Sequence, residues 1–157
     1  MNKKTTVGIN GFGRIGRNVF RLLLNHPTIE VIAINDLADT KTLSHLLKYD
    51  SIHGVLKEDI EYTENEVSVA GKKVKFSSEK NIEDISWGNV DIVVECTGKF
   101  KTKKQLENHL RNGAKKVILS VPPLEDDIKT VVLGVNDNTL SPEDLIISNA
   151  SCTTNNA

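Results

Sequence analysis

The sequence predicts an α/β protein built on a doubly wound, mainly parallel sheet. Short apolar runs rich in β-branched residues alternate along the chain with segments of helical periodicity. Near-continuous apolar runs are typical of parallel strands covered on both faces, and their alternation with helices indicates βαβ units. We expect strands at residues 5–10, 29–35, 91–97, 115–121, 129–135 and 145–150.

The first expected helix lies between the first two strands. Its sequence, RIGRNVFRLLLNHP, places Ile15, Val19, Leu22 and Leu23 on one stripe, and Pro27 follows its expected end. The stripe predicts an apolar face that packs on the sheet. Two further helices are expected as crossovers, around TKTLSHLLK and TKKQLENHLRNG.

Two local signals add detail to this outline. Thr102 is suited to cap the start of the last of these helices, and Gly113 to end it in a left-handed conformation. Residues 60–76 show two alternating segments on either side of Ala70-Gly71, which is the pattern of an antiparallel hairpin. We expect this hairpin to be a small excursion from the parallel sheet.

Composition narrows the class of protein. The 157 residues suffice for one domain with its own core, and 20 Lys and Arg balance 21 Asp and Glu. This balance gives no charge excess that favours nucleic acid or an anionic membrane. No apolar run approaches the ~20 residues of a membrane span, and the first ten residues lack the apolar region of a signal peptide. We therefore expect a soluble, cytoplasmic protein.

A glycine motif follows the first expected strand. The stretch GFGRIG places Gly11, Gly13 and Gly16 between that strand and the first helix. In dinucleotide-binding folds the first such glycine permits a tight turn, the second lets the pyrophosphate approach, and the third lets helix and strand pack closely. The phosphates would meet free amides near Arg14 and Ile15, at the positive end of the helix. The motif and its context predict a Rossmann-type domain.

An acidic residue completes this motif. Asp36 ends the second expected strand, 20 residues after Gly16. A carboxylate at this position can accept hydrogen bonds from the ribose hydroxyls of the cofactor, and its charge repels a 2′-phosphate. We therefore expect NAD rather than NADP as the cofactor.

The two cysteines have different surroundings. Cys96 and Cys152 stand far apart with no CxxC spacing, so we expect neither a disulfide framework nor a metal site. Cys96 closes an apolar strand and is expected to be a small buried side chain. Cys152 opens a polar, helix-compatible segment, and the partial positive charge of a helix N-terminus favours a nucleophilic thiolate. The hydroxyls of Ser151, Thr153 and Thr154 would suit phosphate oxygens.

Five stretches carry a family resemblance. They are VGINGFGRIGR at 7–17, AINDL at 33–37, LLKYDSIHG at 46–54, ECTGKF at 95–100 and SNASCTTN at 148–155. In order and spacing the chain resembles the phosphorylating glyceraldehyde-3-phosphate dehydrogenases over essentially its whole length, and the last octamer is the most specific part. The resemblance implies NAD-dependent oxidation and phosphorylation of glyceraldehyde 3-phosphate to 1,3-bisphosphoglycerate through a cysteine thioester. It also implies a place in glycolysis and a homotetramer.

The resemblance implies roles for individual residues. Cys152 is the expected nucleophile, and Ser151 and Thr153 are expected to contact the substrate or the incoming phosphate. Besides the three glycines of the motif, the implied cofactor contacts are Arg14, Ile15, Asp36, Lys80 and Ser120.

The resemblance also divides the chain into parts. Residues 1–150 would form the NAD(P)-binding Rossmann domain, and residues 151–157 would begin the catalytic segment. The second, catalytic domain of the family, which supplies a histidine base, is absent from this chain. The histidines that are present are expected to be surface, packing or structural residues and not partners of the nucleophile: His26, His45, His53 and His109.

Three other functions stay open at this point. Erythrose-4-phosphate dehydrogenase shares most of these motifs. The chain could also be a dinucleotide-binding module without catalysis. Residues 99–116, KFKTKKQLENHLRNGAKK, hold seven Lys or Arg residues and one acid, which could form a nucleic-acid-binding face, although such charges more often mark a solvated helix.

Overall fold

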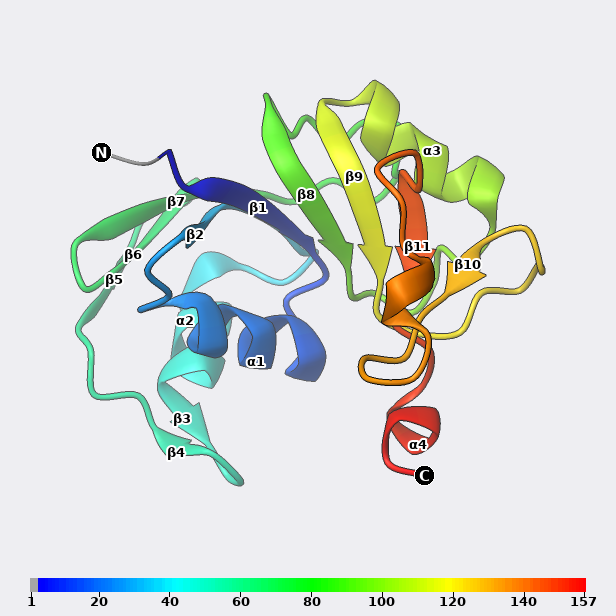
Figure 1. Cartoon of the computed structure of the whole chain (residues 1–157). Coiled ribbons are helices and arrows are strands. Elements are labelled where there is room, and N and C mark those ends of the chain that lie inside the picture. The colour runs from blue at the N-terminus through cyan, green and yellow to red at the C-terminus, as the bar shows by residue number, and fades with distance from the viewer. Residues whose placement is uncertain (1–2) are drawn as a thin grey trace.

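The chain folds into one large mixed sheet with helices on both faces (Figure 1). The structure, a computed structural model, describes residues 3–157. The large sheet is formed by β1 (Thr5–Asn10), β2 (Ile29–Asn35), β5 (Ile60–Tyr62), β6 (Glu66–Val69), β7 (Lys72–Ser77), β8 (Val90–Glu95), β9 (Ala114–Leu119), β10 (Lys129–Thr130) and β11 (Ile146–Ser148). Its strand order is β10-β11-β9-β8-β1-β2-β7-β6-β5.

Helices and short turns connect these strands. Within the described residues they are α1 (Arg14–Leu23), α2 (Thr40–Lys48), α3 (Lys103–Arg111), α4 (Cys152–Asn155) and the 3-10 turn η1 (Asp137–Thr139). None of the helices in residues 3–157 has the length and apolar character needed to cross a membrane. After α2, two short strands that the sequence patterns did not predict form a separate antiparallel pair, β3 (Tyr49–Asp50) and β4 (Gly54–Val55).

The connections wind the sheet in two directions. β1 lies between β2 and β8 and pairs with both in parallel. The chain passes through α1 from β1 to β2 on one side, and through α3 from β8 to β9 on the other. The predicted doubly wound, mainly parallel sheet is therefore confirmed. Its change of direction lies between β1 and β8, which is where such folds place their ligands.

Alternate strand positions build a core on each face of the sheet. Val93 of β8 is in register with Val117 of β9, and Val117 packs with Leu106 of α3. Ile92 and Val94 have the opposite parity and pack instead into the core beneath α1 and α2. Because neighbouring strand residues point to opposite faces, α3 covers one face and α1 and α2 cover the other.

The predicted hairpin forms, and it belongs to the large sheet. β6 and β7 pair antiparallel around Ala70 and Gly71, whose φ angles of 53° and 76° are typical of a type I′ turn. β7 also pairs in parallel with β2. The hairpin and β5 therefore extend the main sheet, and do not form an excursion apart from it, because β7 satisfies the open backbone edge of β2.

The strand expected at residues 129–135 is largely wrong. Only β10 pairs with the sheet, and the chain then turns away. Two side chains capture the backbone that a strand would have used: Asn136 Oδ1 accepts from the Val132 amide, and Asp137 Oδ1 accepts from the Gly134 amide, both at 2.7 Å. Gly134 has a φ of 82°, which a strand excludes. Such local side-chain bonds compete with sheet pairing.

The buried face of α1 also differs from the predicted stripe. Ile15 and Leu22 are 48% and 79% exposed, whereas the other two members of the stripe pack against the core. The centre of the buried face is Phe20, whose ring meets that of Phe12 edge to face at a centroid distance of 5.6 Å. This aromatic pair, formed with a residue before the helix, turns α1 away from the face that periodicity alone predicted.

The other two long helices agree with their predictions. α2 spans the expected residues, and Asp39 caps it by accepting a hydrogen bond from the Thr42 amide at 2.8 Å. α3 begins with a capping box between Thr102 and Gln105. Beyond its end, Gly113 has a φ of 109°, as the sequence predicted.

The glycine loop offers a matched pair of variants. A Cβ added at Gly16 would lie 2.1 Å from the carbonyl oxygen of Gly11, whereas one added at Gly13 would meet no heavy atom of residues 3–157 within 4 Å apart from its chain neighbours. We expect Gly16→Ala to lower the free energy of unfolding by about 2 kcal/mol or more, because backbone must move. Gly13→Ala should cost less than about 1 kcal/mol. Denaturant unfolding measures both, and equal losses would contradict the close packing of α1 on β1.

Candidate functional site

A row of buried polar side chains ends three neighbouring strands. Asn10 is the last residue of β1, and it is in register with Asn35, the last residue of β2, and Glu95, the last residue of β8. All three side chains are buried. Since the strands are parallel, their carboxyl ends lie at one edge of the sheet, and this edge is where ligands bind in open α/β folds.

A cleft of about 220 Å³ opens at this edge. The motif glycines contribute Gly11 and Gly13, and the second strand contributes Asp36. The remaining lining residues are Asn10, Asn35, Leu37, Glu79, Lys80, Cys96, Thr97, Lys99 and Phe100. The cleft thus combines the predicted Gly11, Gly13, Asp36 and Lys80 with residues that the sequence patterns did not single out as site residues.

The glycine loop has the geometry that its motif predicts. Gly11 turns with a φ of 87°, and a Cβ there would meet the Thr97 backbone at 2.8 Å. Gly13 is exposed, its missing Cβ leaves open space, and it caps α1 without any side-chain bond to the first turn. Arg14 and Ile15, which begin the helix, are exposed. The start of α1 therefore has uncapped amides and room for a ligand, which suits a phosphate group.

Asp36 is tied to the loop that it faces. Its Oδ2 accepts a hydrogen bond from the Phe12 amide at 2.6 Å, and its Oδ1 accepts from the Ala38 amide at 2.9 Å. A carboxylate has about four lone-pair sites, so each oxygen can still accept another donor. Asp36 therefore holds the glycine loop in place and remains able to bind hydroxyl groups in the cleft.

The remaining predicted cofactor contacts are divided between the cleft and its surroundings. Lys80 lines the cleft. Arg14, Ile15 and Gly16 adjoin the loop but are not among the lining residues, and Gly16 is buried against Gly11. Ser120 does not line the cleft either: it follows β9, and its Oγ is buried.

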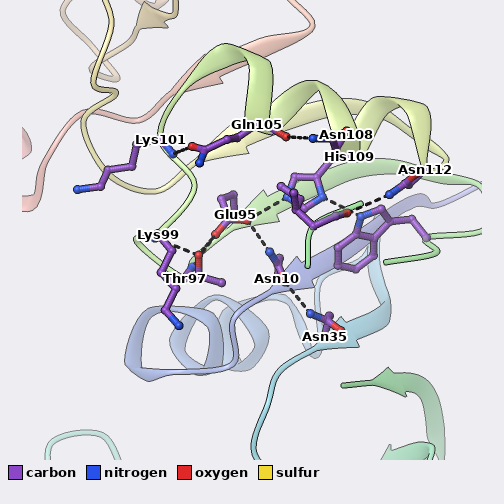
Figure 2. Close-up of polar contacts among 12 residues, drawn as sticks. Asn10, Asn35, Glu95, Thr97, Lys99, Lys101, Gln105, Asn108, His109 and Asn112 are labelled. Carbon is purple, nitrogen blue, oxygen red and sulfur yellow. Dashed lines mark hydrogen bonds and ion pairs between the residues drawn. The ribbon is translucent and has the colours of Figure 1, made fainter. Parts of the chain in front are cut away.

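A buried carboxylate stands behind the cleft. Glu95 is 0% exposed, and donors surround both of its oxygens (Figure 2). Its Oε2 lies 2.6 Å from Asn10 Nδ2 and 2.9 Å from His109 Nε2. Its Oε1 accepts from the Thr97 amide at 2.8 Å and from the Thr97 hydroxyl. This cluster was missed in the sequence analysis. A signal was present, because three apolar strands each end in a polar residue: Asn10, Asn35 and Glu95, which the structure places in register.

Cys152 lies at the same edge of the sheet, after β11. Ala150 has a φ of 58°, and this left-handed residue turns the chain from the strand into α4. Ser151 caps the helix, because its Oγ accepts from the Thr154 amide at 3.0 Å and lies 2.9 Å from Thr153 Oγ1. Cys152 is exposed and is the first residue of α4. The predicted strand-to-helix junction is therefore present.

The strand order sets the spacing between the two parts of the site. β11, β9, β8 and β1 are consecutive and parallel, so three strand spacings, about 14 Å in all, separate the strand before Cys152 from the strand before Gly11. Figure 1 shows α4 and the start of α1 beyond the same ends of these strands. An elongated ligand lying along this edge could reach from one to the other.

The sequence of the chain matches a protein-family model. The model described as glyceraldehyde 3-phosphate dehydrogenase, NAD binding domain, matches residues 5–103. The chain belongs to this family. The match contains the glycine loop, Asp36 and every residue that lines the cleft. The resemblance expected from the sequence is confirmed, and NAD is the cofactor of this glyceraldehyde 3-phosphate dehydrogenase domain.

Curated relatives extend the likeness to nearly the whole chain. Glyceraldehyde-3-phosphate dehydrogenase of Geobacillus stearothermophilus is 53% identical over 152 residues, which are 95% of this chain and 45% of that protein. Glyceraldehyde-3-phosphate dehydrogenase 2 of Streptomyces avermitilis is 55% identical over 153 residues, with the same coverage. The enzyme of Thermotoga maritima is 53% identical, over 95% of this chain and 46% of its own length. The chain thus spans about half the length of these relatives.

The histidines of this NAD-binding domain occupy varied positions. His109, on α3, is fully buried, and the exposed His53 has its Nδ1 3.2 Å from Asp50 Oδ1 at the β3–β4 turn. His45 is exposed on α2, and His26 is half-buried after α1. None of the four is a hydrogen-bond partner of Cys152 among the contacts of residues 3–157. The described residues also hold no group of three or more side chains placed to bind a metal ion.

The two cysteines should differ sharply in reactivity. Cys96, which was expected to be buried, is only half-buried, because its side chain lies in the wall of the cleft. Desolvation there raises the pKa of the Cys96 thiol to about 12, so this group stays protonated at neutral pH. Cys152 is exposed. We expect iodoacetamide at pH 8 to modify Cys152 in the folded protein and Cys96 only after unfolding, as read by peptide mass spectrometry. The Cys152→Ser variant should take up no label while folded. Labelling of native Cys96 would show that the cleft opens further than the structure indicates.

Proposed function

We propose that this chain is the cofactor half of a phosphorylating glyceraldehyde-3-phosphate dehydrogenase of glycolysis. One observation carries the proposal. The cleft, which lies within the part of the chain that matches the NAD-binding family, and the exposed Cys152 at the start of α4 both lie at the carboxyl ends of parallel strands, on the same edge of the sheet. Residues 1–150 would form the NAD-binding Rossmann domain. Residues 151–157 would begin the catalytic segment of a protein whose second domain lies outside this chain.

The residues of the edge fit a dinucleotide in two parts. A cleft of about 220 Å³ is smaller than the ~300–1,000 Å³ of sites that enclose a whole drug-sized ligand. It would therefore hold the adenosine half, with Asp36 accepting from the ribose hydroxyls and Lys80 beside the adenine. The pyrophosphate would lie at the uncapped amides of Arg14 and Ile15. The nicotinamide half would then extend past Ser120 toward Cys152.

The charge of the cleft favours NAD over NADP. Asp36 would place a carboxylate beside the ribose, where a 2′-phosphate would be repelled. Its two backbone bonds hold the carboxylate in position, so it cannot swing away to accommodate that phosphate without releasing the amides of Phe12 and Ala38. Cofactor preference and loop shape would therefore depend on the same side chain.

Cys152 would supply the covalent chemistry. Its thiolate would attack the aldehyde carbon of the substrate and form a carbon–sulfur bond. Bound NAD would supply the acceptor for the hydride. A base outside this chain would take the hydroxyl proton, and inorganic phosphate would then displace the thiolate from the thioester to give the acyl phosphate. Ser151 and Thr153, whose hydroxyls lie beside Cys152 in the capping cluster, would contact the substrate or the phosphate.

The whole enzyme would be a cytoplasmic homotetramer. The family resemblance implies this assembly, and several large apolar side chains are exposed, among them Leu133 and Val135 at 81% and 77%. Exposed apolar surface of this kind is suited to contact with a second domain or another subunit.

Cofactor preference gives a direct test of this proposal. We expect calorimetric titration of the 157-residue chain to show saturable binding of NAD that is stronger than binding of NADP. Asp36→Asn keeps the size of the side chain and one acceptor oxygen but removes the charge. It should weaken NAD binding about tenfold and narrow the preference over NADP, since hydrogen bonds to a charged group contribute about 1.5–3 kcal/mol. Asp126→Asn, at an exposed site away from the cleft, is the matched control. An unchanged NAD to NADP ratio in Asp36→Asn would remove Asp36 from the site.

The role of Cys152 can be separated from cofactor binding. In the longer protein that includes the second domain, Cys152→Ser should lower phosphorylating dehydrogenase activity by at least about a thousandfold. The same substitution should leave NAD affinity unchanged. Asn156→Ala, an exposed position in the same segment, should retain activity. Full activity in Cys152→Ser, measured as NADH formation with glyceraldehyde 3-phosphate and phosphate, would assign the nucleophile to another residue.

A further inference from the structure

Glu95 is a buried acid that the proposed chemistry does not use. Its side chain is fully buried, and among residues 3–157 no lysine or arginine lies within ion-pair distance of it. Its Oε2 faces Asn10 Nδ2 and His109 Nε2, and its Oε1 faces the amide and hydroxyl of Thr97. A buried carboxylate is costly unless its oxygens are fully hydrogen-bonded, so these donors are what allow it to be there.

Trp87 decides which form His109 takes. Trp87 Nε1 lies 2.9 Å from His109 Nδ1, and an indole nitrogen can only donate. His109 Nδ1 must therefore be the acceptor, which leaves the proton of the neutral ring on Nε2. The Nε2–H group points at Glu95 Oε2. The pair of Glu95 and His109 is thus a hydrogen bond from a neutral imidazole to a carboxylate, and not an ion pair.

The position of Trp87 is itself fixed by close packing. The indole is buried against β1, where a Cβ added at Gly8 would lie 2.7 Å from its Cε3 atom. The Trp87 amide donates to the carbonyl oxygen of Asn112, at the end of α3, at 3.0 Å. Because sheet and helix both hold Trp87, neither the indole nor His109 can turn freely.

The chain of hydrogen bonds runs from this buried cluster into the cleft. Glu95 and His109 do not line the cleft, but Asn10 and Thr97, which bond to Glu95, do. Asn10 in turn uses its Oδ1 to accept from Asn35 Nδ2 at 2.9 Å. Figure 2 shows this succession from α3 through β8 and β1 to β2. The carboxylate thereby orients polar walls contributed by three strands.

We propose that Glu95 and His109 are positioning residues for the NAD cleft, with Trp87 selecting the tautomer of His109 that donates to Glu95. The inference rests on the proposed placement of NAD in this cleft. Without the His109 donor, Glu95 Oε2 would lose one of its hydrogen bonds. The carboxylate could then rotate, and the side chains of Asn10 and Thr97 that bond to it would no longer be held in one orientation. Cofactor affinity would then fall even though neither residue lines the cleft.

Two substitutions of His109 separate positioning from packing. His109→Gln keeps a side-chain NH₂ group that can reach the place of Nε2 and donate to Glu95, whereas His109→Leu keeps comparable bulk and removes the donor. Glu95→Gln is an isosteric variant at the other member of the pair. It replaces one acceptor oxygen by an NH₂ group, which would face the donors that surround Glu95. NAD affinity is measured by calorimetry for each variant and the wild type, at a temperature below every melting transition, and melting temperatures are recorded beside it.

The outcomes distinguish the two proposals. We expect NAD binding to weaken about tenfold in His109→Leu and in Glu95→Gln, the loss of one hydrogen bond to a charged group, and to stay close to wild type in His109→Gln. Unchanged affinity in all variants, with lowered melting temperatures, would assign the cluster to stability alone and overturn the inference. Equal weakening in His109→Gln and His109→Leu would also overturn it. If His109→Leu does not fold, the comparison of Glu95→Gln with His109→Gln tests the inference: weaker NAD binding in the first and near wild-type binding in the second would support it, and any other result would overturn it. Absence of NAD binding by the folded wild type would instead refute the proposed function, and the inference with it.

Discussion

A single buried carboxylate connects the parts of the chain that form the cleft. Glu95 ends β8, accepts from Asn10 at the end of β1, and accepts from His109 on α3. An unpaired charge in this position would cost many kcal/mol, so strands and helix must meet in the one arrangement that supplies its donors. The packing of α3 on the sheet and the shape of the cleft therefore both depend on the hydrogen bonds of Glu95.

The glycine loop adds a second constraint on the other side of the cleft. Gly16 brings α1 so close to Gly11 that no side chain fits between them, and Asp36 holds the loop through the Phe12 amide. In the proposed function Asp36 recognises the ribose of NAD. The same side chain is part of the scaffold, because it satisfies the backbone donors of Phe12 and Ala38 at the sharp turn.

Cys152, the proposed nucleophile, is placed by the same architecture but by a separate element. Parallel strands bring every βα junction to one edge, so the turn at Ala150 and the capped start of α4 face the same side as the cofactor cleft. The cofactor cleft and Cys152 therefore lie at one edge of the sheet but are contributed by separate elements. What a second domain would add is the base and the walls around the substrate.

Local sequence patterns were enough to predict the features that depend on neighbours close along the chain. Periodicity predicted the strands at 5–10 and 29–35, the cap at Thr102 and the hairpin turn at Ala70-Gly71, and the glycine spacing predicted the loop. Contacts between distant segments were needed to pair β7 with β2 and to bring the row of strand ends against a histidine from α3. The reason is physical: propensity and capping act within a few residues, whereas strand register and the pairing of buried polar groups are set by contacts between distant segments.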